Sequence, residues 1–178
     1  MESSFQLKPR DGSLRELALT GSFPPRWPGN LTAALAAQNI NIVSAHAVKK
    51  RFEWDATFVL DLSQFSGDID SVNFTELAYT EPDDLPDGAV QLTRYALQRL
   101  PTGDLEVSIS GPDQIGFLAR LLRRMTVLTL FPREFDIDTV SGRIKDRIVL
   151  GGIGNLMPTP AVMNSLENAL QGMTQPAA

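Results

Sequence analysis

The chain contains an internal duplication, in which a short strand, a glycine-containing loop and a helix follow one another twice. Gly29 and Gly116 each stand two residues before a leucine, at Leu31 and Leu118. Each also follows a segment with strand character, residues 17–20 or 107–110. Self-similarity of this kind is typical of a chain built from two related structural units. We therefore expect a pseudo-symmetric fold.

Both copies resemble the start of an ACT domain, the small βαββαβ module that binds amino acids and regulates metabolic enzymes. In that family an Asp or Asn, two residues and Gly-x-Leu join the first strand to the first helix, and the second copy matches this pattern from Asp113 to Leu118. The first copy keeps Pro28 and Gly29 and is similar to the tandem ACT repeats of the nitrogen-sensing uridylyltransferases. It departs at Arg26, which occupies the position that matches Asp113.

The resemblance implies an α+β fold of two ferredoxin-like βαββαβ units, with antiparallel sheets and helices on one face. We expect the first unit over residues 12–100, including an irregular segment at 64–88, the second over 103–171, and a loose tail at 172–178. Helical spacing of Leu92, Ala96 and Leu100 predicts the last helix of the first unit over 89–100. No strand follows the final helix, so the second sheet is either incomplete or completed by a strand from residues 71–80.

Several strands are indicated by alternation of apolar and polar residues, most clearly over residues 54–62, where Trp54, Phe58 and Leu60 share one face. The second copy predicts a strand near 105–110, a helix near 115–125 and a hairpin over 135–150. Thr159 and Pro160 together indicate the start of a last helix.

Composition excludes several kinds of site. The net charge of −5 gives no broad attraction to nucleic acid or to an anionic membrane, so we expect neither as a partner. The absence of cysteine excludes a thiol nucleophile and a cysteine metal site, and a single histidine, His46, excludes a histidine cluster. With neither a signal peptide nor an apolar run of about 18 residues in the sequence, we expect a cytoplasmic protein.

The resemblance places a free amino acid at the junction of two ACT units, against the strand-to-helix loops and the adjacent strand. Unpaired amides and the partial positive charge at a helix start suit a carboxylate there. Asp113 receives the ammonium group or caps the following helix, and both roles stay open. The candidate ligand-binding residues are Arg26, Pro28, Gly29, Asn30, Asn41, Gly111, Asp113, Gln114, Ile115 and Gly116.

The leading hypothesis is a stand-alone regulatory protein without cofactor or metal, in which amino-acid binding changes association with a partner enzyme or regulator. The alternative is a module that kept the ACT fold for protein interaction or dimerisation and lost the ligand, as Arg26 suggests. An enzyme is the least favoured class, because neither paired carboxylates nor a nucleophile with its base is evident. An unpaired sheet edge leads us to expect a homodimer.

Overall fold

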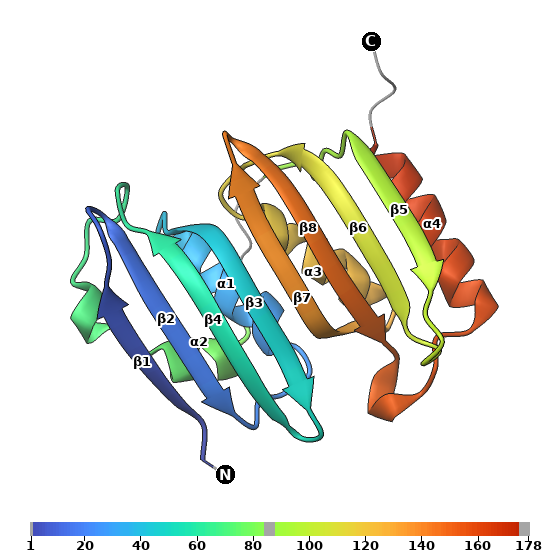
Figure 1. Ribbon diagram of the computed structural model, residues 1–178, viewed down its shortest axis with the longest axis horizontal. Helices are drawn as coiled ribbons and strands as arrows, with labels where there is room; N and C mark the ends of the chain where they lie inside the picture. The colour runs from blue at the N-terminus through green and yellow to red at the C-terminus, as the bar shows by residue number, and fades with distance from the viewer. Residues whose placement is uncertain (1, 84–87, 175–178) are drawn as a thin grey trace.

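In the computed structural model of the protein, which describes residues 2–83 and 88–174, eight strands form one antiparallel sheet. Four helices of this part of the chain lie behind the sheet in Figure 1, and the other face is open. The strands are β1 (Ser4–Pro9), β2 (Leu14–Gly21), β3 (Asn41–Lys50), β4 (Glu53–Asp61), β5 (Arg94–Arg99), β6 (Leu105–Pro112), β7 (Phe131–Val140) and β8 (Arg143–Gly151). The helices are α1 (Trp27–Ala37), α2 (Phe74–Tyr79), α3 (Phe117–Val127) and α4 (Pro160–Met173), and 3-10 turns lie at Ile69–Ser71 and Ile153–Asn155.

Each half of the chain follows the order ββαββα, and the second half repeats the first after about 90 residues. Thus α1 and α3 begin at Trp27 and Phe117, while β3 and β7 begin at Asn41 and Phe131. The sheet order is β1-β2-β4-β3-β7-β8-β6-β5, so equivalent strands stand at equal distances from the centre. An approximate two-fold axis therefore passes between β3 and β7, which pair with each other.

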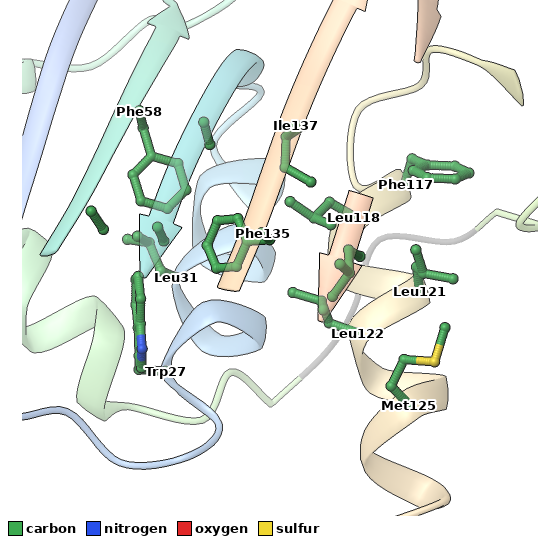
Figure 2. Close-up of a cluster of buried hydrophobic side chains, with 14 of the residues drawn as sticks. Trp27, Leu31, Phe58, Phe117, Leu118, Leu121, Leu122, Met125, Phe135 and Ile137 are labelled. Carbon is green, nitrogen blue, oxygen red and sulfur yellow. The ribbon is translucent and has the colours of Figure 1, made fainter. Parts of the chain in front are cut away.

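The core lies between the sheet and the helices, and alternation in the strands supplies it. In β4 the predicted apolar face is confirmed, because Trp54, Phe58 and Leu60 are almost fully buried. Figure 2 shows the helical side chains Trp27, Leu31 and Leu118 directed toward this layer. The two central helices also touch, since a Cβ atom added at Gly29 would lie 3.9 Å from Cβ of Leu122. The two halves therefore share one core.

The expected βαββαβ order is wrong, because the fourth strand of each half precedes the other three. β1 pairs with β2 as a hairpin, and β5 pairs with β6 in the same way. The four strands of the second half thus all precede α4 in the described part of the chain, and neither explanation offered for a missing strand applies. Residues 71–80 instead contain α2, whose first turn is capped by the Asn73 side chain accepting from the Glu76 amide at 3.1 Å.

The helix predicted over residues 89–100 is also wrong, because the second half of this stretch forms β5 and none of it is helical. Tyr95 and Leu97 are half-buried while their neighbours are exposed, which is a two-residue period. Leu92 matched a helical spacing by chance, since it lies outside the strand and its amide donates to the Met173 carbonyl. Pairing with β6 decides the conformation, and such a partner cannot be identified from local periodicity.

Gly29 and Gly116 are not equivalent, contrary to the alignment from the sequence. The residue before each central helix is Arg26 in the first half and Gly116 in the second, and Gly29 lies inside α1. Gly116 has a φ of +81°, in the left-handed region, whereas Arg26 has a φ of −90°. The two loops therefore enter their helices by different backbone conformations.

The expected domain bounds, 12–100 and 103–171, stay predictions about separately folding units. Of the predicted tail at 172–178, α4 includes the first two residues, and 175–178 lie outside the described residues. The same holds for residues 84–87 of the irregular segment. Within the described ranges, we find no helix with the length and hydrophobicity needed to cross a bilayer.

Candidate functional site

The two halves meet at a pair of related junctions, each formed by the loop before a central helix and strands from both sides of the axis. We call the first the acidic cavity, which has a volume of about 30 Å³. Its lining is mostly apolar, with Gly116 and the polar residues Thr32, Asn41, Asp113, Gln114, Thr139 and Asp146. We call the second the basic pocket, which has a volume of about 450 Å³ and is lined by Arg26, Lys49, Trp54, Tyr79, Glu81 and Arg133, among others.

The two junctions occupy equivalent places in the two halves. Lys49 and Trp54 of the basic pocket correspond, after the shift of about 90 residues, to Thr139 and Ile144 of the acidic cavity. Arg26 corresponds to Gly116 in the same way. The two halves therefore carry two junctions with a similar framework and different charged residues.

In the acidic cavity, residues that are far apart in sequence meet across the junction. The Nδ2 atom of Asn41, at the start of β3, donates to Oδ2 of Asp113 at 3.0 Å. The loop before α3 is thus tied to the other half of the molecule. Of the two roles left open for Asp113, that of a cap for α3 is excluded, because Gly116 is the residue before the helix and no side chain caps it. The carboxylate is instead positioned at the cavity wall.

Asp146 is the most unusual group in the acidic cavity. It lies on the inward face of β8 and is only 2% exposed. Its Oδ1 atom accepts from the Asp138 amide at 3.3 Å, but Oδ2 has no partner among the described residues. The buried hydroxyl of Thr139 also lacks a partner there. Two buried oxygen atoms of the cavity wall are therefore unsatisfied.

Burial raises the pKa of Asp146 to about 7, because a charged carboxylate loses its hydration in this position. The hydrogen bond from the Asp138 amide lowers the pKa and so opposes this shift. The negative charges of Asp113 and Asp138 raise it further. In the folded protein, the Asp146 carboxyl group therefore stays protonated until the pH is close to neutral.

The basic pocket is built on a cross-strand pair, Lys49 and Trp54, which lie directly opposite each other on β3 and β4. Trp54 is 2% exposed, and its indole Nε1 finds no acceptor among the described residues. Lys49 is half-buried and makes no ion pair with a described carboxylate. Burial lowers the pKa of Lys49, and the positive charge of Arg133 lowers it further. The pocket therefore combines a buried donor without an acceptor, the Trp54 indole, with a lysine whose charge is disfavoured.

The other charged groups of this pocket are already partly balanced. The Nε atom of Arg133 lies 3.2 Å from Oδ1 of Asp104, and its Nη1 donates to Oδ1 of Asn155 at 2.6 Å. The Nη1 atom of Arg26 lies 3.4 Å from the Glu81 carboxylate, and both of these side chains are largely exposed. A long contact between exposed groups contributes little to stability, so Arg26 is available to turn toward a ligand.

The structure distributes the candidate residues from the sequence among several places. Arg26 and Asn30 line the basic pocket, and with Gly29 they also line an adjoining pocket of about 400 Å³. Asn41, Asp113, Gln114 and Gly116 line the acidic cavity, and Ile115 lines a neighbouring depression of about 200 Å³. Pro28 is buried in α1, and a Cβ atom at Gly111 would meet the Gln91 carbonyl at 2.6 Å, so these two are packing positions.

Three important residues were missed by the sequence analysis: Lys49, Trp54 and Asp146. Each lies on the inward face of its strand, where Trp54 was predicted only as part of the core. Lys49 continues the inward positions of Ala45 and Ala47, and Asp146 stands between two buried isoleucines on β8. A charged residue in the inward register of an alternating strand was the available signal.

Comparisons with known proteins identify no relative by sequence: no family model matches, and no curated protein matches. Among solved structures, the chain is similar to the crystal structure of aspartate kinase from Synechocystis, with a TM-score of 0.49 and 13% identity. The match covers 90% of this chain and 27% of the kinase chain, so the protein spans about a quarter of the length of that structure.

Proposed function

We propose that this chain is an ACT-type regulatory module that binds a free amino acid in the basic pocket. The observation that carries the proposal is the Trp54 indole, a buried donor without an acceptor among the described residues, directly opposite the half-buried ammonium group of Lys49, which has no carboxylate partner there. A buried indole N–H without an acceptor is costly, and a carboxylate would accept from it and balance the lysine at once.

The rest of the pocket suits the other parts of an amino acid. Glu81 offers a carboxylate for the ammonium group, and it lies beside Arg26 at the pocket rim. Pro24, Phe131 and Ile153 form an apolar wall against which a side chain packs. A volume of about 450 Å³ falls within the range of small-molecule sites in proteins.

Regulation follows from the position of the pocket between the halves. Arg26, Lys49 and Trp54 come from the first half, while Phe131, Arg133 and the turn at Ile153–Asn155 come from the second. A ligand that contacts both sides favours the arrangement in which they are close, because binding energy is gained only there. The proposed output is a change in the association of this module with a partner enzyme.

A thermal-shift screen against the twenty amino acids tests the proposal. A ligand at about 100 times its dissociation constant adds about 2.7 kcal/mol, which raises the melting temperature of a chain of this size by roughly 5–10 °C. We expect a rise for one amino acid or a chemically related few. The rise should disappear with methyl esters of the same amino acids, because the esters lack the carboxylate. A rise that is equal for acid and ester would exclude the proposed orientation.

A protein-interaction module is the second candidate, and one observation favours it. Ile153, Leu156 and Met157 are 58%, 69% and 67% exposed, and the first of them also lines the basic pocket. Apolar side chains gathered in this way are typical of contact surfaces. A screen without any amino-acid response would favour this candidate, and capture of a partner that is lost on substitution of Leu156 and Met157 by serine would support it.

A further inference from the structure

The basic pocket keeps a positive charge that an amino acid with a neutral side chain cannot balance. The charged residues of its wall are three cations and one anion: Arg26, Lys49, Arg133 and Glu81. Asp104 lies outside the wall, but its Oδ1 atom is 3.2 Å from Nε of Arg133 and balances one of the cations. Among the described residues, three cations thus stand against two carboxylates, which leaves one positive charge in excess.

Lys49 and Arg133 are neighbours across the central pair of strands. β3 and β7 pair as far as Val48 and Glu134, and these two cations are the next residues along the two strands. Burial lowers the pKa of Lys49, and the positive charge of Arg133 lowers it further. The Nη1 atom of Arg133 donates to Asn155 at 2.6 Å, which holds the guanidinium group in place. The two positive charges therefore repel each other in the ligand-free protein.

Arg26 is the cation of the wall that is free to contact a ligand directly. Its side chain is 54% exposed, and its Nη1 atom lies 3.4 Å from the carboxylate of Glu81, which is 70% exposed. An ammonium group that binds Glu81 takes this partner away from Arg26. A planar guanidinium group donates two parallel hydrogen bonds to a carboxylate, so a second carboxylate on the ligand would replace the lost partner.

We propose that the ligand of the basic pocket is an acidic amino acid, aspartate or glutamate, whose side-chain carboxylate binds Arg26. This inference rests on the proposed function and adds the class of amino acid. The α-carboxylate then lies against Trp54 and Lys49, the ammonium group lies against Glu81, and the methylene groups of the side chain pack on the apolar wall. An acidic amino acid carries one net negative charge, which balances the excess of the pocket.

Other classes of ligand fit the same wall less well. A basic amino acid adds a positive charge to the existing excess, and a dicarboxylic acid without an ammonium group brings a carboxylate against Glu81. The two asparagines of the wall are already engaged, because Nδ2 of Asn30 donates to the Ala78 carbonyl at 3.2 Å and Asn155 accepts from Arg133. The wall therefore distinguishes a side-chain acid from its amide by charge.

Calorimetric titration of the whole chain with matched ligands tests this inference. The ligands are glutamate, glutamine and glutarate, and aspartate, asparagine and succinate, at neutral pH and equal ionic strength. Within each set, the second ligand lacks the side-chain charge and the third lacks the ammonium group. We expect at least one acidic amino acid to bind at least about tenfold more tightly than the other two members of its set.

The possible failures are distinguishable. Binding of an amide, or of another of the twenty amino acids, that equals or exceeds that of both acidic amino acids would overturn this inference and leave the proposed function standing. Glutarate or succinate that binds as tightly as the corresponding amino acid would overturn both, because the ammonium group would then have no role. The absence of binding by any amino acid would overturn the proposed function, and this inference with it.

Substitution of Arg26 locates the recognition of the side chain. Arg26→Gln should weaken binding of the acidic amino acid by about tenfold or more and leave binding of its amide nearly unchanged, so that the preference for the acid is lost. Arg124→Gln is the matched control, because Arg124 is exposed on α3 and is not part of the pocket wall, and it should keep the preference. A preference that survives Arg26→Gln would overturn the assignment.

Discussion

His46 and Asp136 face each other across the central pair of strands, with Nδ1 of the imidazole 2.5 Å from Oδ1 of the carboxylate. They occupy equivalent positions in the two halves, so the approximate two-fold axis passes between them. Two identical halves would place the same side chain opposite itself here, and like charges in directly opposed positions repel. The two halves instead present complementary side chains at this position.

Exchange of this pair tests its contribution. His46→Asp alone places two carboxylates opposite each other, and we expect a loss of roughly 0.5–1 kcal/mol, because both groups are well exposed. His46→Asp combined with Asp136→His restores the pair in the opposite sense. Urea unfolding at neutral pH should therefore show the double variant to be more stable than the single one. A small deficit should remain, since Asp136 also accepts from Arg147 at 3.2 Å.

The two glycines of the sequence pattern should respond in opposite ways to alanine. Gly29→Ala lies inside α1 with 3.9 Å of clearance, so the added methyl group should stabilise the protein by roughly 0.5–1 kcal/mol. Gly116→Ala requires a left-handed residue with a side chain, and its Cβ would lie 2.8 Å from Nη1 of Arg120. We expect a loss of roughly 1–3 kcal/mol. Chemical denaturation of both variants measures this difference, and similar effects would contradict the assignment of Arg26 as the counterpart of Gly116.

Neighbouring lysines on β3 provide a matched test of the basic pocket. Lys49 lines the pocket, whereas Lys50 is exposed on the other face and pairs with Asp55 at 3.2 Å. Lys49→Met should weaken binding of the amino acid found in the screen by at least about tenfold, since a charged hydrogen bond contributes about 1.5–3 kcal/mol. Lys50→Met should leave the affinity unchanged.

For Lys49→Met we also predict an effect on the protein without ligand, which is independent of the effect on binding. Because burial already disfavours the charge of Lys49, Lys49→Met should not lower the melting temperature and is expected to raise it slightly. Calorimetric titration and thermal unfolding measure the two effects separately. Loss of both affinity and stability would indicate that Lys49 supports the fold, contrary to its proposed role.

Stability should fall as the pH rises toward neutrality. The pKa of Asp146 is raised from its ordinary 3.8 to about 7, so between these values the folded protein holds a proton that the unfolded chain has lost. The free energy of unfolding then decreases with rising pH by up to roughly 4 kcal/mol, and it becomes constant above about pH 7. Urea unfolding at several pH values measures this slope.

Asp146→Asn should remove most of this dependence, because the amide does not titrate. Asp61 contributes in the opposite direction at lower pH, since hydrogen bonds from Ser13 and Ser63 lower its pKa and its contribution is lost as the pH falls below about 4. The decisive window is therefore pH 4–7. An unchanged slope in the Asp146→Asn protein would show that another group causes it.

The fold was predictable where the signal was local. Alternation over β4 and the Thr159 cap before α4, which accepts from the Val162 amide at 3.3 Å, are visible in single segments. The strand β5 was not, because only its pairing with β6 separates it from a helix with the same apolar spacing. The order of the strands within each half was missed for the same reason.

Part of the site was also accessible from the sequence. Asn41 and Asp113 were both candidates, and the fold joins them by a hydrogen bond although 72 residues separate them. The positions of Lys49 and Asp146 in the walls of two cavities depend on how the two halves pack, which local sequence patterns do not reveal. The sequence analysis identified the loops at the two junctions, but it did not identify the strand residues Lys49 and Asp146 that line them.

The continuous sheet across β3 and β7 places two halves of similar architecture side by side within one polypeptide. In a dimer of identical chains, every substitution is made twice, so both junctions must carry the same chemistry. A single chain with two halves is free of that constraint, and here the buried unsatisfied atoms are nitrogen donors in one junction and oxygen atoms in the other. Because both halves belong to one chain, the two junctions are present in equal number at any protein concentration. The connection of the two halves in one chain therefore allows the residues of one junction to differ from those of the other.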